Sequence, residues 1–393
     1  MRCQLTEISP GRFLCSNCNE EAKGPPGSPG HSIYKPCAFV GPNQPSLAAR
    51  RTIQIPGLNG PAPPNGKLLI KHKAGLGDHV KLTVLLRHLQ HYFPQWQVEV
   101  ASALPKLFTG LFPSHSLGRT PPEAEYVAVR EVKCANPHGT AGAAPATFIE
   151  DALRRLFVRE PLEELCQYLL LPSEHDFERA RLFLNSHCEQ REDGKFQAVV
   201  LHYEGNSYKA HKNLSHATAA AVIDEAVAAG YTVVLLDWSQ RSPHSSRRGV
   251  VNPGRGHRLW TGGFPSHPLT IAAVIELSAA FVGIDSGPSY IAGATNTPGL
   301  VNWVGYHPAN LYHLAPNIIH VVPDDVEQYL RGNAAAKQAG TTYFHRRYAH
   351  AYTGNDREGV LASALALMLQ DELAALEKYR PLEPYQSPNA FVA

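Results

Sequence analysis

The sequence lacks both a strong excess of charge of one sign and any apolar run long enough to cross a membrane. Its 36 Lys and Arg residues nearly balance its 34 Asp and Glu residues, so the net charge is only +2. A net charge this small does not indicate a protein that binds nucleic acid or a membrane surface through overall positive charge. No apolar run approaches the roughly 20 residues of a membrane span, and the first residues lack the apolar core of a signal peptide. We therefore expect a cytoplasmic protein with no nucleic-acid partner and no membrane span.

Two common phosphate-binding patterns are also missing. No Gly-Lys-Ser/Thr follows the glycine turn Gly75-Leu76-Gly77, so this turn is not a P-loop. The dinucleotide-binding fingerprint needs a third small residue at the position that Val80 occupies. The turn therefore belongs to neither of these nucleotide-binding classes.

Cysteine is sparse, and it is concentrated near the start of the chain. In a cytoplasmic protein, cysteines indicate metal ligands or free thiols rather than a disulfide framework. The Cys15-x-x-Cys18 spacing lets two thiolates take adjacent corners of a tetrahedral metal site. We expect a structural zinc site, with iron or no metal as the alternatives, and His31 as a possible replacement ligand. The four candidate ligands are Cys3, Cys15, Cys18 and Cys37.

The length and the order of apolar segments predict two αβ domains. Residues 1–65 contain the cysteine segment and a linker rich in Pro and Gly. β/α alternation then occupies residues 66–190, and it restarts after a charged stretch to fill residues 191–355. Residues 356–393 contain a helical pattern, which we expect to cross back to the first domain, and a loose tail.

The first αβ domain opens on Gly66–Val80, which predicts a buried strand, a glycine turn and the start of a helix. The apolar run Leu68–Ile70 is typical of an interior parallel strand. Gly75 and Gly77 allow a sharp turn and a close approach of the backbone to a ligand. Asp78 begins the helix, where a carboxylate is stabilised as an anion and is suited to act as a general base. A purely structural turn is the alternative.

The second candidate site is Asp285-Ser286-Gly287-Pro288, which follows a predicted strand at residues 281–284. Free N–H groups and the Ser286 hydroxyl at such a position suit a diphosphate. Lys209 and Lys212, on the loop after the strand at residues 198–202, can supply positive charge to the same phosphates. The alternative is that Asp285 caps a helix or anchors a buried loop.

Three motifs in this order resemble those of glycosyltransferase family 9, the lipopolysaccharide heptosyltransferases and their relatives. The first is Lys71-x-x-Ala74-Gly75-Leu76-Gly77-Asp78-His79-Val80. The second is Val200-Leu201-His202 with Ser207 and Lys212, and the third is Phe281 to Pro288 with the later Ala292 and Pro298. The resemblance covers about residues 66–330. It implies an α/β fold of the GT-B architecture, with two facing Rossmann-like αβα domains, an interdomain cleft and, in this chain, an added N-terminal Cys-rich metal-binding segment.

The resemblance also implies an activity, namely inverting and metal-independent transfer of a sugar from a nucleoside-diphosphate sugar. The acceptor is a hydroxyl of a glycan, a lipid-glycan or a protein, and Asp78 is the general base. Lys212, or Lys209 if an insertion shifts the loop, neutralises the leaving diphosphate. Asp237 ends the strand where the family often binds the nucleoside. The remaining donor-site residues are Gly75, Gly77, Asp285, Ser286, Gly287 and Tyr290. No Asp-x-Asp triplet, the metal–diphosphate device of the other large glycosyltransferase fold, occurs in the chain.

The chain departs from the family pattern at Tyr290, where the family usually carries His. A phenol thus replaces an imidazole near the donor sugar. Two other interpretations stay open: a catalytically degenerate GT-B protein that binds nucleotide sugar or a protein partner, and a GT-B sugar-nucleotide epimerase or hydrolase. The cysteine segment is likewise outside the basic family pattern, and we expect it to order either the acceptor side of the cleft or a homo-oligomer contact.

Overall fold

A computed structural model describes most of the two expected αβ domains and only strands of the N-terminal segment. Among the described residues, no helix is long and apolar enough to span a bilayer. The structure describes residues 5–9, 12–15, 21–23, 66–132, 149, 152–157, 159–205, 212–254, 257, 259, 268–303, 315–323, 348–352 and 357–370.

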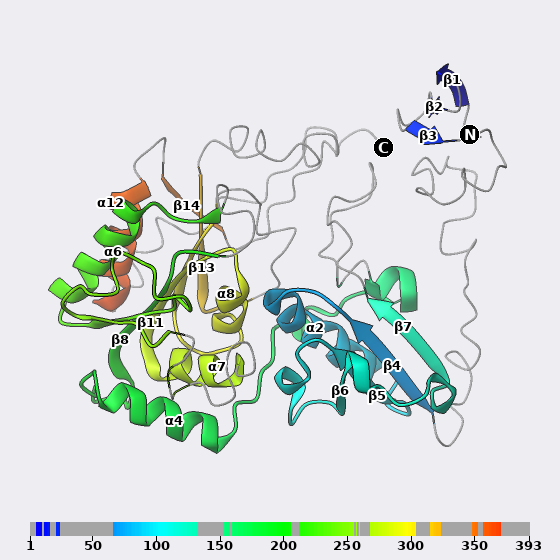
Figure 1. Cartoon of the computed structure of the whole chain (residues 1–393), viewed down its shortest axis with the longest axis horizontal. Helices are drawn as coiled ribbons and strands as arrows, with labels where there is room; N and C mark the ends of the chain where they lie inside the picture. The colour runs from blue at the N-terminus through cyan, green and yellow to red at the C-terminus, as the bar shows by residue number, and fades with distance from the viewer. Residues whose placement is uncertain are drawn as a thin grey trace.

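The first unit is a four-stranded, all-parallel sheet with the long helix α2 on one face (Figure 1). Its strand order is β6-β5-β4-β7. Leu68 and Ile70 of β4 point into the same apolar core as α2, whereas Leu69 packs on the opposite face. An interior parallel strand is covered on both faces, which explains the unbroken apolar run of β4. The elements are β4 (Lys67–His72), α2 (Leu76–Tyr92), β5 (Gln97–Ser102), β6 (Ser114–Ser116) and β7 (Ala128–Val132).

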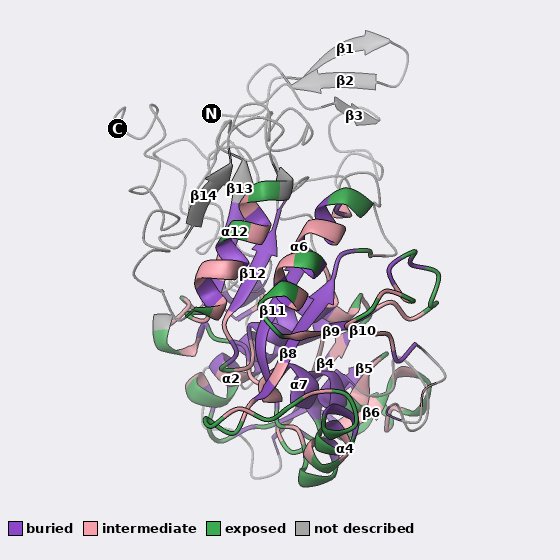
Figure 2. Cartoon of the chain, turned by 90° about the vertical axis from the view of Figure 1, so that its left-hand side faces the viewer, coloured by how far each residue is buried: buried purple, intermediate pink, exposed green. Residues whose placement is uncertain are grey.

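The second unit is a seven-stranded parallel sheet with helices on both faces (Figures 1 and 2). Its strand order is β10-β9-β8-β11-β12-β13-β14. The apolar residues of α6 and α12 cover one face, and those of α7 and α8 cover the other. The strands are β8 (Phe196–His202), β9 (Thr232–Leu235), β10 (Val250–Val251), β11 (Ser278–Ile284), β12 (Gly299–Asn302), β13 (Ile318–Pro323) and β14 (Tyr348–Tyr352). The helices are α6 (His216–Ala228), α7 (Pro268–Leu277), α8 (Gly287–Ala292) and α12 (Arg357–Leu369).

Each sheet reverses its direction of growth at one point. In the first sheet the chain runs from β4 to β5 and β6, and then returns to place β7 on the other side of β4. In the second it runs from β8 to β9 and β10, and then returns to place β11 beside β8. Open α/β sheets bind their ligands at the carboxyl edge of such switch points. The loops after β4, β8 and β11 are therefore where a ligand site is expected in this fold. All three loops carry predicted site residues.

The apolar spacing of residues 148–170 predicts a helical stretch interrupted at Pro161, but Glu160 to Leu169 is largely irregular, because side chains of α2 bind its backbone. The Leu162 N–H donates to Nε2 of His88 over 2.9 Å, and the Leu169 N–H donates to the Thr83 hydroxyl over 3.1 Å. Each of these N–H groups would otherwise serve a regular helix. Among the described residues from 152 to 169, the helical elements are a π-helical turn (Leu153–Phe157), before this segment, and a 3-10 turn (Glu163–Leu165), within it.

Two helices that the predicted boundaries placed outside the second domain pack on the second unit. Helix α4 (Glu174–Asn185) begins at the expected cap Ser173, and Asp176 accepts a 2.7 Å bond from Thr270 of α7. Helix α12, which we expected to cross back to the first unit, instead packs on α6 and the seven-stranded sheet. Its apolar positions, such as Leu361 and Leu365, are fully buried there. Residues 371–393 lie outside the described residues.

The N-terminal segment contains a small antiparallel sheet, which the sequence analysis did not predict. The strands are β1 (Leu5–Ser9), β2 (Arg12–Cys15) and β3 (Glu21–Lys23). Cys15 is the last residue of β2. The side chain of Cys15 and the whole of Cys3, Cys18 and Cys37 lie outside what the structure describes, so the metal site stays a prediction. Among the described residues, no group of His, Cys, Asp and Glu is arranged to hold a metal ion.

The largest apolar cluster is continuous from the first unit to the second. It contains Leu82 and Leu85 of α2 together with Ile275 of α7 and Tyr290 and Ile291 of α8. Figure 2 shows the buried residues concentrated along the strands and the inner faces of the helices. The two units are therefore joined by buried side chains, and the contact runs through α2 and α8.

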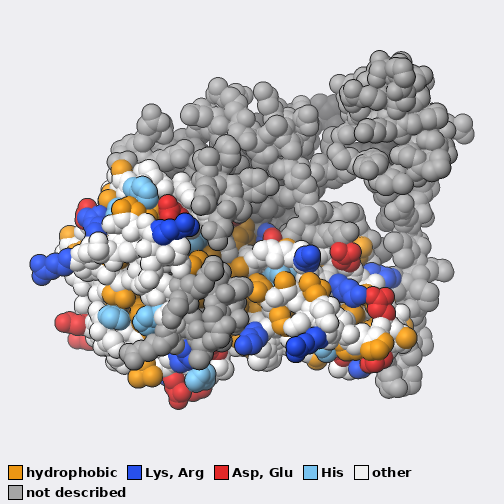
Figure 3. Space-filling view, in the orientation of Figure 1, with side chains coloured by type: hydrophobic (Ala, Val, Ile, Leu, Met, Phe, Trp, Pro, Cys, Tyr) orange, Lys and Arg blue, Asp and Glu red, His pale blue; other side chains and the backbone are white. Residues whose placement is uncertain are grey.

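Charged side chains of both signs are interspersed on the face seen in Figure 3. Lys, Arg, Asp and Glu side chains lie on both units among apolar ones. On this face, the described residues form no large patch of one sign.

Candidate functional site

Asp78 lies in the first turn of α2, directly after the β4 switch-point loop. Its Oδ2 accepts a hydrogen bond of 3.3 Å from the Gly75 N–H, which closes the turn. Its Oδ1 lies 2.7 Å from Nζ of Lys81, one helical turn further on. The Asp78 side chain is 28% exposed and that of Lys81 only 4%. The carboxylate is thus fixed at both oxygens and still reachable from solvent, as a general base must be.

Two buried histidines, His72 and His79, form hydrogen bonds with backbone carbonyls next to this turn and in the neighbouring strand β7. Nδ1 of His79 lies 2.8 Å from the Gly75 carbonyl, and Nδ1 of His72 lies 2.8 Å from the Val132 carbonyl. The two rings meet edge to face with their centroids 4.7 Å apart. Burial lowers the pKa of both imidazoles, that of His79 to about 4. Each ring is therefore neutral near pH 7 and donates from Nδ1 to its carbonyl, which stiffens the loop that carries Asp78.

The second half of the site is built around Asp285, at the carboxyl end of β11. Its Oδ1 accepts a hydrogen bond of 2.9 Å from the Tyr290 hydroxyl, and its Oδ2 pairs with Nζ of Lys212 at 2.8 Å. Burial raises the pKa of Tyr290, and the charge of Asp285 raises it further. The phenol therefore stays protonated and donates. The ion pair between Lys212 and Asp285 thus ties together the loops after β8 and β11, and a phosphate site shared by these loops stays a prediction.

The two halves meet through a reciprocal interlock of two glycines. A Cβ on Gly77 of α2 would lie 2.6 Å from Cδ2 of the Tyr290 ring on α8. A Cβ on Gly287 of α8 would lie 2.8 Å from the side chain of Leu76 on α2. Contacts this short are not possible for real side chains, so each unit needs a glycine where the other presents a large residue. We expected these glycines to approach a ligand; in the structure each approaches the opposite unit.

The Tyr290 ring is held on several sides. Nζ of Lys81 lies 4.9 Å from its centroid, and the Tyr168 ring meets it edge to face at 5.9 Å. Sequence analysis found neither Lys81 nor Tyr168. The only available signal for Lys81 was a lysine three residues after Asp78 on an otherwise apolar stretch of helix. Tyr168 had no signal, because its contact depends on the irregular path of residues 160–169.

Two polar side chains near this edge have atoms without a hydrogen-bond partner among the described residues. One is the Ser286 hydroxyl, which follows Asp285. The other is Asn302, fully buried at the end of β12 and paired in register with Ile284 of β11. A buried unpaired amide costs about 1–3 kcal/mol, so such groups are good candidates for contacts with a polar ligand.

Of the remaining predicted residues, the structure describes Asp237. The Asp237 carboxylate accepts hydrogen bonds from the Ser239 N–H and hydroxyl and from the Ser242 N–H, at 2.7 to 3.1 Å. It therefore shapes its own loop, and its proposed contact with a nucleoside stays a prediction. Lys209 and Ser207 lie outside the described residues.

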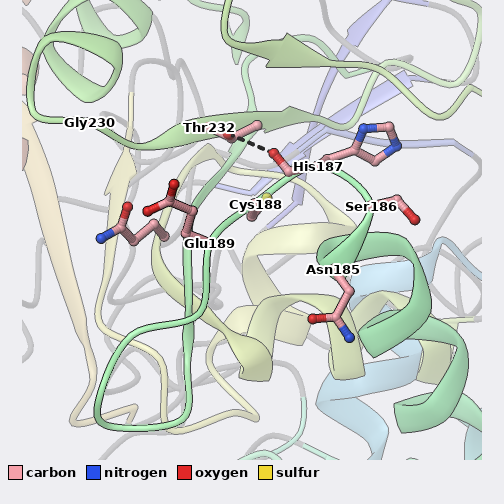
Figure 4. Close-up of a pocket in the computed structure, with 8 residues that line it drawn as sticks. Asn185, Ser186, His187, Cys188, Glu189, Gly230 and Thr232 are labelled. Carbon is pink, nitrogen blue, oxygen red and sulfur yellow. Dashed lines mark hydrogen bonds between the residues drawn. The ribbon is translucent and has the colours of Figure 1, made fainter.

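A separate open pocket of about 590 Å³ lies away from these residues (Figure 4). It is formed by the end of α4 and the first residues of β8 and β9, including Cys188, Gln197 and Thr232. This is the amino edge of the parallel strands, opposite the edge that carries Asp285. Burial raises the pKa of the Cys188 thiol to about 11, so the thiol is protonated and poorly nucleophilic. The pocket has no evident role in the chemistry at the switch points.

The fold is that of GT-B glycosyltransferases, with two parallel-sheet units of Rossmann type. Among solved structures, the chain is similar to the glycosyltransferase family 9 protein of Veillonella parvula DSM 2008. The TM-score is 0.53 at 12% identity, over 79% of this chain and 100% of that one. It is also similar to the ADP-heptose lipopolysaccharide heptosyltransferase II of E. coli, with a TM-score of 0.53 at 14% identity, over 78% of this chain and 99% of that one. At these identities the similarity establishes the fold, and it confirms at that level the resemblance suggested by the three motifs.

In sequence, the chain matches no protein-family model and no curated protein. What the comparisons show is therefore a similarity of three-dimensional fold.

Proposed function

We propose that the chain is an inverting glycosyltransferase that uses a nucleoside-diphosphate sugar and no catalytic metal. The observation that supports this proposal is that Tyr290 links Asp78 to the Asp285–Lys212 pair across the α2–α8 contact. Its ring lies against Lys81, which pairs with Asp78, and its hydroxyl donates to Asp285. Asp78, Lys212 and Asp285 come from three loops, all at the carboxyl edges of switch points. A base on one unit and a cation on the other are what displacement of a nucleoside diphosphate requires.

The proposed step is a direct displacement at the anomeric carbon. The Asp78 carboxylate takes the proton of the acceptor hydroxyl as that oxygen attacks the carbon from the face opposite the nucleotide. The bond from the anomeric carbon to the phosphate oxygen breaks, and its electron pair leaves with the diphosphate. Lys212 compensates the charge that develops there, with Lys209 as a second cation. The configuration at the carbon is inverted, and no covalent intermediate with the protein is formed.

The identity of the sugar is a finer part of the proposal. The similar E. coli enzyme is named for ADP-heptose, so a heptose-like or related sugar is the first donor to test. The acceptor is a hydroxyl of a glycan, a lipid-glycan or a protein. We place the reaction in the cytoplasm, where nucleotide sugars are made. A structural zinc at Cys3, Cys15, Cys18 and Cys37 and a homo-oligomer are further parts of this proposal.

The experiment is a screen of nucleotide sugars with acceptor mixtures, following release of nucleoside diphosphate. Asp78→Asn keeps the shape and the Gly75 contact but removes the base, so transfer should fall by about 100-fold or more. Unchanged turnover in a folded Asp78→Asn protein would rule out the mechanism. Donor consumption without any acceptor would instead indicate an epimerase or hydrolase. Donor binding without consumption would indicate a degenerate, binding-only protein.

A further inference from the structure

We propose that Lys81 is a positioning residue for the Asp78 carboxylate, and that the Tyr290 ring holds Lys81 in place from the opposite unit. This inference rests on the proposed role of Asp78 as general base. It assigns a function to Lys81, which directly follows the first motif, and a second function to Tyr290 of the predicted donor site.

The first argument is the burial of the Lys81 ammonium group. Nζ lies 2.7 Å from Oδ1 of Asp78, and the Lys81 side chain is only 4% exposed. A lysine is rarely buried without a compensating charge, because removing an ammonium group from water costs several kcal/mol. Ion pairs between neighbours on an exposed helix surface contribute roughly 0–1 kcal/mol, and their side chains remain mobile. This pair differs because the lysine is enclosed and therefore has one defined position.

The second argument is that the Tyr290 ring covers one side of the buried Lys81 ammonium group. Nζ of Lys81 lies 4.9 Å from the ring centroid, within the range of a cation–π contact. The ring cannot turn away, because the backbone of Gly77 packs against it and its hydroxyl donates to Asp285. The edge-to-face contact with Tyr168 fixes it from a further side.

The consequence is that the second unit controls the orientation of the base on the first. Lys81 fixes Oδ1 of Asp78, and the Gly75 N–H fixes Oδ2, so the carboxylate can present only its solvent-reachable side. When α2 and α8 are in contact, Lys81 is pressed toward Asp78. If the two helices separated, Lys81 would lose its contact with the Tyr290 ring. Its ion pair with Asp78 would then no longer hold Oδ1 in one position. Misplacement of a catalytic group by about 1 Å can cost about 100-fold in rate.

The test compares Lys81→Met, Lys81→Arg and a control, Lys106→Met, which removes an exposed lysine of the same unit. Methionine fills the enclosure without charge, so kcat should fall by about 100-fold while KM for the nucleotide sugar changes less than about twofold. Arginine restores a cation within reach of Asp78, so it should recover at least about a tenth of the wild-type kcat. Lys106→Met should match the wild type. Melting curves establish that each variant is folded.

A second measurement does not depend on activity. In a protein with isotopically labelled lysine, the ε-methylene protons of Lys81 should resonate upfield of the other lysines, because they lie over the Tyr290 ring. Tyr290→Phe keeps the ring and should keep the shift, whereas Tyr290→Leu should abolish it.

The outcomes separate this inference from the proposed function. A wild-type protein that transfers sugar, together with an unchanged kcat in folded Lys81→Met, overturns the positioning role alone. An ordinary Lys81 resonance overturns the role of Tyr290. A wild-type protein that transfers no sugar under any condition overturns the proposed function, and with it the positioning role.

Discussion

The contacts of Tyr290 in the structure change how its presence in the sequence is interpreted. In the sequence it stands where glycosyltransferase family 9 usually carries His, so a phenol replaces an imidazole there and an inactive protein is one interpretation. In the structure its hydroxyl donates to Asp285 and its ring contacts Gly77 and Lys81. The residue therefore connects both halves of the candidate site, and its presence is compatible with an active enzyme.

Buried histidines give a residue-level prediction about stability and pH. Burial lowers the pKa of His79 and of His202 from 6.5 to about 4. Below pH 6.5 the unfolded chain binds protons that the folded chain does not, so stability is complete above that pH and is lost as the pH falls toward 4. Each pH unit in this window removes up to about 1.4 kcal/mol per histidine.

Urea unfolding at pH 7.5, 6 and 5 measures this loss. His79→Gln should make the dependence on pH shallower, whereas His91→Gln, at an exposed position of the same helix, should leave it unchanged. An equal slope in wild-type protein and in His79→Gln would contradict the assignment of a neutral, buried His79.

At the scale of elements, the contact between α2 and α8 gives the sharpest prediction. Gly77→Ala places a methyl group against the Tyr290 ring, where the nearest ring atom is 2.6 Å away. The ring or the helix must move, which should destabilise the protein by about 1–3 kcal/mol and reduce transfer. Gly118→Ala adds the same methyl group where nothing lies within 4 Å, and it should be neutral. Denaturant midpoints and turnover rates check both variants, and a neutral Gly77→Ala would mean that the two helices are not packed this closely.

The N-terminal segment gives a second prediction at this scale. If Cys3, Cys15, Cys18 and Cys37 form a tetrahedral thiolate site, the purified full-length chain should carry about one zinc ion. Cys15→Ser with Cys18→Ser should lower the metal content by about one equivalent, whereas Cys188→Ser, in the second unit, should not. Metal analysis by mass spectrometry decides this, and four titratable thiols in a metal-free protein would exclude the site.

Much of the arrangement of elements could be predicted from the sequence. The interior strands β4, β8 and β11 carry mainly apolar runs. In the sequence, Ser173 with Asp176 and Ser215 predict capped helix starts, and α4 and α6 begin there. The edge strand β6 was missed because Ser114–Ser116 contains no apolar residue, and β10 was missed because Val250–Val251 is too short to form a pattern. The apolar spacing of residues 160–169 predicts a helix, which the structure does not form. The backbone bonds of this segment to His88 and Thr83 of α2 depend on tertiary contacts that spacing does not reveal.

The same distinction applies to the site. Asp78, Asp285 and Lys212 could be found because each follows a strand in a recognisable motif. The interlock of Gly77 with Tyr290, the enclosure of Lys81 and the path of α12 depend on how the two units pack. No local pattern encodes that packing, because the residues involved are about 90 to 210 positions apart in the chain.

At the scale of the whole molecule, the continuous apolar cluster makes the two units one cooperative body in the described state. The candidate site lies at the α2–α8 contact between the units, so the proposed function predicts that a donor is bound by residues of both. Asp285 holds Lys212 in this state, and a bound diphosphate would compete with Asp285 for the ammonium group. The affinity for a nucleoside diphosphate therefore reports directly on the central claim.

The most direct test is calorimetric titration with ADP, UDP, GDP and dTDP in metal-free buffer. The account predicts that one diphosphate binds clearly better than the others, and that Lys212→Met weakens its binding by about tenfold or more while the protein remains folded. Lys106→Met serves as the charge-matched control and should bind like the wild type. If no diphosphate binds, or if Lys212→Met binds as tightly as the wild type, the loops after β8 and β11 are not a donor site and the proposed function is wrong.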